Sequence, residues 1–178
     1  NTTGCRNTGL GYAALIYNTT GNFNTAVGAC AAYNTSTGIN NTVIGFAALR
    51  ANSTGCNNTA VGYHAMCSNT TAKHNTAVGY QALMDNTTGT YNTAFGYRSA
   101  FNVSTGCQTT ASGYNALYCL TTGCKNVALG TNAGCVITTG HCNIAIGAGA
   151  GPNAAGLNNT VTIGNDAQAT ATNDFILG

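Results

Sequence analysis

The sequence predicts an all-β fold: a parallel β-solenoid of about ten 17-residue rungs. One glycine column recurs with this period from Gly11 to Gly164, and a second runs from Gly4 to Gly140, interrupted only by Ala72. The consensus rung is N-T-T-G-x-x-N-T-A-V-G-Y-x-A-L-x-x, with rung 1 at residues 1–17 and rung 2 at 18–34. Two-helix repeats need roughly 33 residues or more, whereas this shorter period suits one parallel β-coil per repeat.

The strand of each rung is predicted at the T-A-V stretch. The residue after the strand asparagine is β-branched in every rung, which is a strand preference. These residues are Thr8, Thr25, Thr42, Thr59, Thr76, Thr93, Thr110, Val127, Ile144 and Val161. Two residues later stand Leu10, Val27, Ile44, Val61, Val78, Phe95, Ser112, Leu129, Ile146 and Ile163. A spacing of two puts both columns on one face of the strand. Because threonine exchanges with valine and isoleucine, we expect that face to be buried.

The column between these two is nearly all small, as at Gly9, Ala26 and Ala60. Small side chains would let a second surface approach closely, either another face of the coil or another chain.

The stretch after the strand, G-Y-x-A-L, begins with a glycine and an aromatic position. The aromatic residues are Tyr12, Phe46, Tyr63, Tyr80, Tyr97 and Tyr114. Five residues are too few for periodicity to distinguish a second short strand from one helical turn, and both interpretations stay open. N-T-T-G is typical of a turn in which glycine takes the conformation with positive φ.

The repeat divides the chain into residues 1–151, with nine regular rungs, and residues 152–178, with a divergent last rung and a C-terminal cap or junction. Gly151-Pro152-Asn153 interrupts the loop, and Asn159 to Gly164 contains one residue more than its counterparts. We expect the tail from Thr170 to Gly178 to have no repeat partner.

The composition narrows the function classes. Only 4% of residues are charged and the net charge is +2, so a basic nucleic-acid face is not expected. No run of 18 apolar residues occurs, so no membrane span is expected. The chain has three aspartates, Asp85, Asp166 and Asp174, and no glutamate, and no two of the aspartates are neighbours in the sequence. Nothing resembles a nucleophile elbow or a phosphate loop, so no catalytic residues and no cofactor are expected. Without a C-x₂-C pair, and with scattered histidines, no metal site is expected either.

Motifs such as Asn24-Thr25-Ala26-Val27-Gly28 and the run from Asn75 to Leu83 resemble the head repeats of trimeric autotransporter adhesins. They also resemble the shafts of phage and algal-virus tail fibres. The ending is similar to segments that precede a self-cleaving intramolecular chaperone in such fibres. The resemblance covers nearly the whole chain. It implies a parallel β-roll or β-helix, often homotrimeric, that is displayed outside a cell or virion.

Asn-x-Ser/Thr sequons are frequent, and they predict covalent glycans on a secreted protein. One row lies in the turn: Asn1, Asn18, Asn34, Asn52, Asn69, Asn86 and Asn102. A second set precedes the strand: Asn40, Asn57 and Asn158. The alternative has equal weight: asparagine and threonine favour turns, and N-T-T-G could arise for that reason alone.

The nine cysteines favour an oxidising, extracellular compartment. Three pairs of cysteines recur at nearly the same separation, which suggests within-rung disulfides. These would join Cys56 to Cys67, Cys107 to Cys119 and Cys124 to Cys135. The competing scheme joins stacked rungs, for example Cys107 to Cys124. Cys5, Cys30 and Cys142 remain, and an odd total invites an interchain bond.

The leading hypothesis is therefore a secreted structural fibre at a cell or virion surface. Its partner would be itself, as a homotrimer or as an end-to-end filament. Two alternatives remain: an ice-binding solenoid with an exposed threonine ladder, and a fibre that binds a surface carbohydrate or receptor through its aromatic column.

Overall fold

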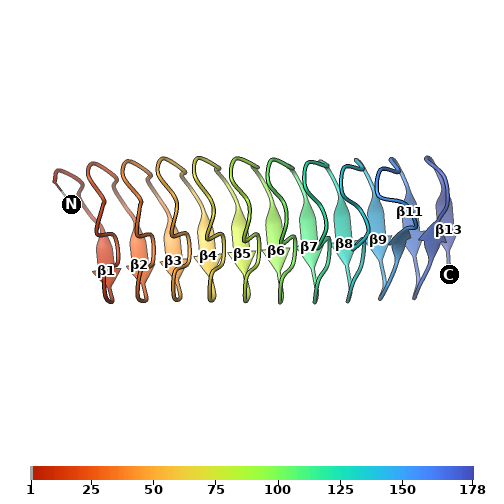
Figure 1. The fold of residues 1–178 in the computed structure, drawn as a ribbon, viewed down its shortest axis with the longest axis horizontal. Coiled ribbons are helices and arrows are strands. Elements are labelled where there is room, and N and C mark those ends of the chain that lie inside the picture. Colours follow the sequence, from red (N-terminus) through yellow and green to blue (C-terminus); the bar gives the residue numbers. More distant parts are fainter. Residues whose placement is uncertain (1) are drawn as a thin grey trace.

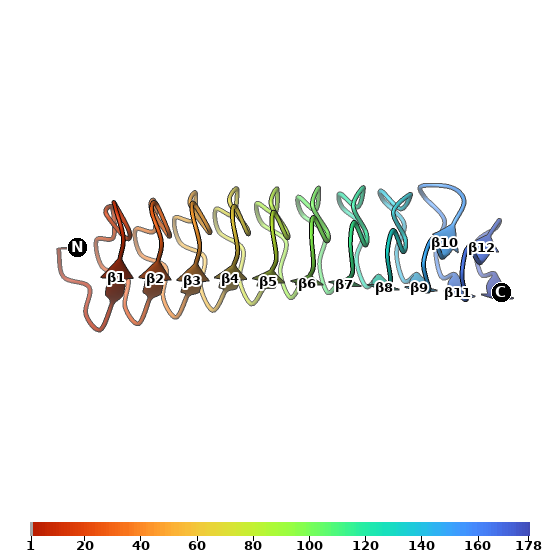
Figure 2. The ribbon, with the colours of Figure 1, turned by 90° about the horizontal axis from the view of Figure 1, so that it is seen from below.

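The computed structural model describes residues 2–178 and shows a parallel β-solenoid, confirming the predicted fold class. The rungs stack into a straight rod with the two termini at opposite ends (Figure 1; Figure 2). The strands are β1 (Thr8–Leu10), β2 (Thr25–Val27), β3 (Thr42–Ile44), β4 (Thr59–Val61), β5 (Thr76–Val78), β6 (Thr93–Phe95), β7 (Thr110–Ser112), β8 (Val127–Leu129), β9 (Ile144–Ile146), β10 (Gly151–Pro152), β11 (Val161–Ile163), β12 (Gln168–Ala169) and β13 (Phe175–Leu177). The sequon at Asn1 lies outside the described residues.

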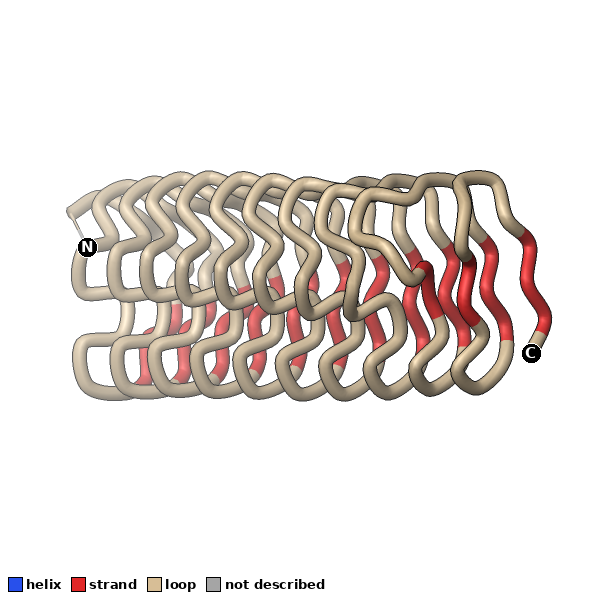
Figure 3. The backbone as a smooth tube through the Cα atoms, turned by 45° about the vertical axis from the view of Figure 1, so that its right-hand side comes forward, coloured by secondary structure: helices blue, strands red, loops and turns tan. Residues whose placement is uncertain are grey.

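Strands β1 to β9, β11 and β13 form one parallel sheet of 11 strands along one side of the rod (Figure 3). Thr8 pairs with Thr25, and Thr25 with Thr42, so neighbouring strands are related by the 17-residue period. Strands β10 and β12 form a second, two-stranded sheet.

The C-terminal tail does have a repeat partner, which corrects the sequence-based expectation. Val161 pairs with Phe175, which lies closer in the sequence than one full period. The Gly178 amide donates to the Ile163 carbonyl at 2.8 Å, as the Gly164 amide does to that of Ile146. The tail is thus a further, shortened coil. The 17-residue period does not indicate this coil, because its pairing Val161 to Phe175 is shorter than one period.

The extra residue expected between Asn159 and Gly164 is also absent. Thr160 occupies the place of the strand asparagine, and its amide donates to Oδ1 of Asn143 at 3.0 Å. Asn159 belongs to the preceding corner, where its φ of 54° matches the 58° of Asn57. The 17-residue register therefore continues into the last rung.

The G-Y-x-A-L stretch of the regular rungs is neither a strand nor a helical turn. No helix occurs between residues 2 and 178. In rung 3 the stretch is a turn in which Ala47 (φ 51°) and Leu49 (φ 49°) both adopt the left-handed conformation. The stretch therefore lacks the consecutive negative φ values of a right-handed helix. The cost, roughly 1–2 kcal/mol per residue, is offset by burying Leu49 in the core.

The inside and outside of the strand are the reverse of the expectation. The small middle column points inward, and Ala26, Ala60 and Ala77 are completely buried. The β-branched and aliphatic columns on either side are exposed or half-buried. The small side chains let the opposite wall of the same coil approach, which was one of the two alternatives. That wall contributes Leu49, Met66, Leu83 and Leu117 to a single apolar cluster.

A ladder of buried asparagines joins the rungs beside the strand. In the middle of the rod it consists of Asn24, Asn41, Asn58, Asn75 and Asn92, all about 1% exposed. Oδ1 of Asn75 accepts the Asn92 amide at 2.8 Å, and Nδ2 of Asn75 donates to the Gly89 carbonyl at 2.9 Å. Each side chain thereby satisfies buried backbone groups in the next rung.

The glycine after each strand is required by conformation and space. Gly28 has a φ of 130°, which side-chain-bearing residues rarely adopt. A Cβ there would lie 2.6 Å from the Gly45 carbonyl oxygen of the next rung. Close stacking therefore depends on the absence of this atom.

Candidate functional site: the outer sheet face

Two rows of side chains cover the outside of the 11-stranded sheet, and a third row lies in the turn that follows each strand. We define the threonine row as the ten β-branched residues from Thr8 to Val161. The aliphatic row is the set two residues later, from Leu10 to Ile163. The aromatic row consists of Phe46, Tyr63, Tyr80, Tyr97 and Tyr114. No residue in these rows is charged.

The aliphatic row leaves large apolar side chains in solvent. Leu10 is 66% exposed and Leu129 is 51% exposed, and Ile44, Phe95 and Ile163 are exposed as well. Soluble monomers rarely expose long contiguous apolar surfaces, which mark interaction sites. This surface is therefore the strongest functional candidate on the rod.

The aromatic row is a continuous stack. Tyr63, Tyr80, Tyr97 and Tyr114 follow one another at centroid separations of 5.1 Å, with interplanar angles of 5–7°. Phe46 extends the stack at 5.4 Å from Tyr63. The stacked faces cover one another, so within the stack it is mainly the ring edges that face solvent. Stacking in the aromatic row therefore joins neighbouring rungs, and the row extends the apolar surface beside the aliphatic row.

The sequons divide into buried and exposed sets. Asn18, Asn52, Asn69 and Asn86 are 0–1% exposed. Nδ2, the atom that would carry a glycan, donates to the Gly55 carbonyl at 3.1 Å from Asn52 and to Oδ1 of Asn52 at 2.8 Å from Asn69. The coil has no room for a glycan on these four side chains. The prediction of an outer glycan row is therefore wrong at these positions, where the asparagines are core residues.

Five described sequons remain accessible to different degrees. Asn34, Asn40 and Asn57 are exposed. Asn102 and Asn158 are half-buried, and their Nδ2 atoms donate to the carbonyls of Tyr118 (2.9 Å) and Gly156 (3.1 Å). Glycosylation of the three exposed asparagines stays a prediction.

All nine cysteines are thiols in the structure, and Cys107 contacts a cysteine of the next rung. The Cys107 amide donates to Sγ of Cys124 at 3.1 Å. A hydrogen bond that the Cys107 thiol donates to Cys124, helped by partial burial, raises the pKa of Cys107 to about 11. This geometry favours the scheme that joins stacked rungs at Cys107 and Cys124.

The other predicted disulfide residues have different surroundings. Burial, and next the nearby Cys119 thiol, raise the pKa of Cys135, so these two also lie close together across rungs 7 and 8. Burial raises the pKa of Cys67, which forms a hydrogen bond with Arg50. Sγ of Cys56 donates to the Thr54 carbonyl at 3.2 Å. Cys5 and Cys142 are exposed, and Cys30 is half-buried.

Within residues 2–178, no cluster of histidine, cysteine and aspartate could hold a metal ion. The same residues contain no helix long and apolar enough to cross a membrane. No protein-family model, curated protein or solved structure matches the chain.

Sequence reasoning missed two features. The buried asparagine ladder could have been recognised, because asparagine occupies the position before the threonine row in eight of the ten rungs, from Asn7 to Asn143. The other feature is a hollow beside Arg50, described below. Its residues lie in three different rungs, and no local motif indicates it.

Proposed function

We propose that the chain is a structural segment of an extracellular fibre that associates with further copies of itself. The observation that carries this proposal is the exposed aliphatic row along the outer sheet face. Apolar burial is the main driving force for association, and a face without charges has little desolvation penalty to overcome.

A second copy is the partner that best fits this surface. The row repeats with the period of the rungs, so an identical chain presents side chains at the same spacing along its whole length. Two or three rods packed face to face would cover Leu10, Ile44, Phe95 and Leu129, in agreement with the proposed homotrimer.

The repeat also supports growth along the rod. The Gly28 amide donates to the Leu10 carbonyl in the preceding rung, whereas the Thr25 amide donates to the Asn41 carbonyl in the following one. Each rung thus offers complementary groups on both edges. The same pattern can add rungs from this chain or from another copy by strand addition. Glycans on Asn34, Asn40 and Asn57 would keep an almost uncharged fibre soluble.

Sedimentation velocity of purified chain tests the lateral association. Ile44→Lys/Phe95→Lys/Leu129→Lys places three charges in the aliphatic row of rungs 3, 6 and 8. Thr37→Lys/Thr88→Lys/Thr122→Lys adds the same charge to exposed turns of the same rungs. We expect the wild type and the turn variant to form oligomers and the row variant to sediment as a monomer. A monomeric wild type, or equal loss of oligomers in both variants, would refute the proposal.

A second candidate function, ice binding, is favoured by the exposure of the threonine row. Thr8, Thr25, Thr42 and Thr110 are exposed on a regular sheet. Thermal hysteresis at micromolar protein, lost in Thr25→Lys/Thr42→Lys, would support ice binding over a purely structural role. Its absence in the wild type would remove this candidate.

A further inference from the structure

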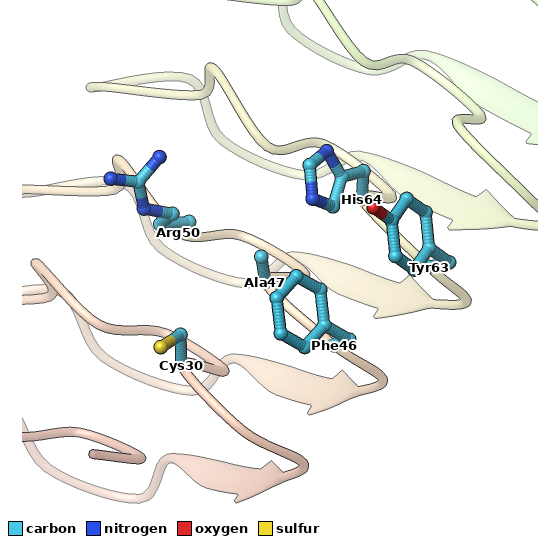
Figure 4. Close-up of a pocket in the computed structure, with 6 residues that line it drawn as sticks. All are labelled: Cys30, Phe46, Ala47, Arg50, Tyr63 and His64. Carbon is cyan, nitrogen blue, oxygen red and sulfur yellow. The ribbon is translucent and has the colours of Figure 1, made fainter. Parts of the chain in front are cut away.

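A hollow of about 430 Å³ opens on the flank of the rod, beside the aromatic row. It is lined by Cys30, Phe46, Ala47, Arg50, Tyr63 and His64, which come from rungs 2, 3 and 4 (Figure 4). This volume lies within the range of small-molecule sites, which is roughly 300–1,000 Å³.

The floor of the hollow exists because two side chains are small. At the position two residues after the second glycine of the rung, rungs 2 and 3 carry Cys30 and Ala47, whereas rungs 4, 5 and 6 carry His64, Gln81 and Arg98. The larger side chains cover the flank of their rungs. In rungs 2 and 3, the space that these larger side chains would fill next to Cys30 and Ala47 is open.

One wall is an aromatic ring with a free face. The aromatic row ends at Phe46, since Ala29 takes the place of a ring in rung 2. The ring contacts of Phe46 are with Tyr63 and His64, both in rung 4. Its face toward rung 2 has no stacking partner, and the side chain lines the hollow and is 48% exposed. Unlike the rings within the stack, Phe46 can therefore offer a whole face to a ligand.

The opposite side carries a cation, Arg50, that contacts neutral groups. Arg50 forms a hydrogen bond with the Cys67 thiol. Burial, and next the charge of Arg50, lower the pKa of His64, so this imidazole is neutral at pH 7. His64 stacks on Tyr63 at 4.2 Å and forms the end wall. Arg98 provides the contrast: its Nε donates to Gln81 at 2.8 Å, and its guanidinium lies over the rings of Tyr97 and Phe101.

We propose that this hollow binds a carboxylate-bearing pyranose, such as a uronic acid residue of an acidic polysaccharide. The apolar face of the sugar ring lies on Phe46, and the carboxylate pairs with the Arg50 guanidinium. Guanidinium groups match carboxylates with two parallel hydrogen bonds. The neutral His64 can donate to or accept from a hydroxyl group. This binding activity goes beyond the proposed fibre function and does not depend on it.

Isothermal titration calorimetry with tri-galacturonate tests the site, with neutral galactotriose and benzoate as comparison ligands. We expect tri-galacturonate to bind and galactotriose to bind at least about tenfold more weakly, since the neutral sugar lacks the charge-assisted hydrogen bonds to Arg50. Arg50→Gln should reduce the affinity for tri-galacturonate to that of the neutral sugar. Arg98→Gln, the matched loss of one charge on the same flank, should leave it unchanged.

A second variant tests the hollow without changing the charge. Ala47→Gln fills the space with the side chain that rung 5 already carries at this position, where Gln81 has a φ of 54° and Ala47 one of 51°. The variant should fold, as circular dichroism would verify, and should lose binding. Equal binding of the neutral sugar, equal losses in Arg50→Gln and Arg98→Gln, benzoate binding as tight as that of tri-galacturonate, or full binding by folded Ala47→Gln would each overturn the proposal.

Discussion

Rungs 4 to 6 and rungs 7 to 9 fill the same interior position with opposite chemistry. The first residue of the N-T-T-G turn, here called the turn site, is Asn52, Asn69 and Asn86 in the first group. It is Val103, Leu120 and Ile137 in the second. All six side chains are completely buried.

At the turn site, one backbone therefore accepts either a continuous row of asparagines or a continuous row of aliphatic side chains. In rungs 4 to 6 the asparagine amides bond to one another and to turn carbonyls. In rungs 7 to 9 the aliphatic side chains belong to the apolar core cluster. The turn site is therefore a core position in both halves. A sequon there reflects the needs of the coil.

The largest effect should come from mixing the two chemistries. Leu120→Asn puts an amide between Val103 and Ile137, where it loses apolar burial and can reach only the nearby turn carbonyl. We expect about 3–4 kcal/mol of destabilisation in urea unfolding. Leu120→Val, the matched control, should cost less than about 1.5 kcal/mol. Equal costs for the two variants would contradict the interpretation.

A disulfide should stabilise rungs 7 and 8 by a similar amount. Oxidation of the stacked thiols of Cys107 and Cys124 closes a loop of about 17 residues, which corresponds to roughly 3 kcal/mol. Peptide mapping of protein treated with oxidised glutathione should find this pair, and Cys107→Ser should abolish the gain in unfolding free energy. Recovery of Cys107 linked to Cys119 would instead support the within-rung scheme.

Breaking the row of turn-site asparagines, Asn52, Asn69 and Asn86, at one point should have a smaller effect. Asn69→Leu removes the 2.8 Å hydrogen bond to Asn52 and an acceptor for Asn86, but it adds apolar burial. We expect a loss of about 1–2 kcal/mol. The triple variant Asn52→Leu/Asn69→Leu/Asn86→Leu should lose less than the sum of the three single variants, because it leaves fewer unpaired amides. Additive losses would show that the ladder does not act as a unit.

The smallest effect is a pH dependence of the reduced protein. Since the folded-state pKa of Cys107 is raised to about 11, the unfolded chain releases this proton at a lower pH than the folded chain. The contribution of Cys107 to stability is therefore constant below pH 9 and declines between pH 9 and 11. Cys107→Ser should reduce this decline in urea unfolding curves recorded across that range. An unchanged decline in the variant would assign it to other groups.

The period and the strand positions were predictable because close stacking imposes them. Gly28 and its equivalents must lack a Cβ, so they recur at every rung and reveal the 17-residue spacing. The β-branched residues beside them then mark each strand. These features depend on contacts between identical positions, which the sequence displays directly.

Which face of the strand lies inside could not be read from a period of two alone. Alternation shows that Thr42 and Ile44 share a face, but it does not say whether that face is buried. The inward column of this coil is mostly small, with Val43 and Thr162 as its largest members, because the opposite wall already contributes Leu49 and Met66. The constancy of the small column around Ala60, against the variation from Phe95 to Ser112 outside, was the available signal.

The candidate site was partly visible for the same reason. The aromatic row follows from the repeat, because it recurs at one position of successive rungs. The hollow at Arg50 arises instead where the repeat is broken, at Ala29, Cys30 and Ala47. A departure from the consensus does not indicate which residues lie near it in space. The proximity of the Phe46 ring and the Arg50 guanidinium could therefore be recognised only in the structure.

Cryo-electron microscopy of the purified chain at assembling concentrations tests the central claim most directly. The account predicts rods with a rung repeat of about 4.8 Å, packed so that Ile44, Phe95 and Leu129 of neighbouring copies meet at the interface. Single dispersed rods, or assemblies joined through the N-T-T-G turns with the aliphatic row facing solvent, would contradict it.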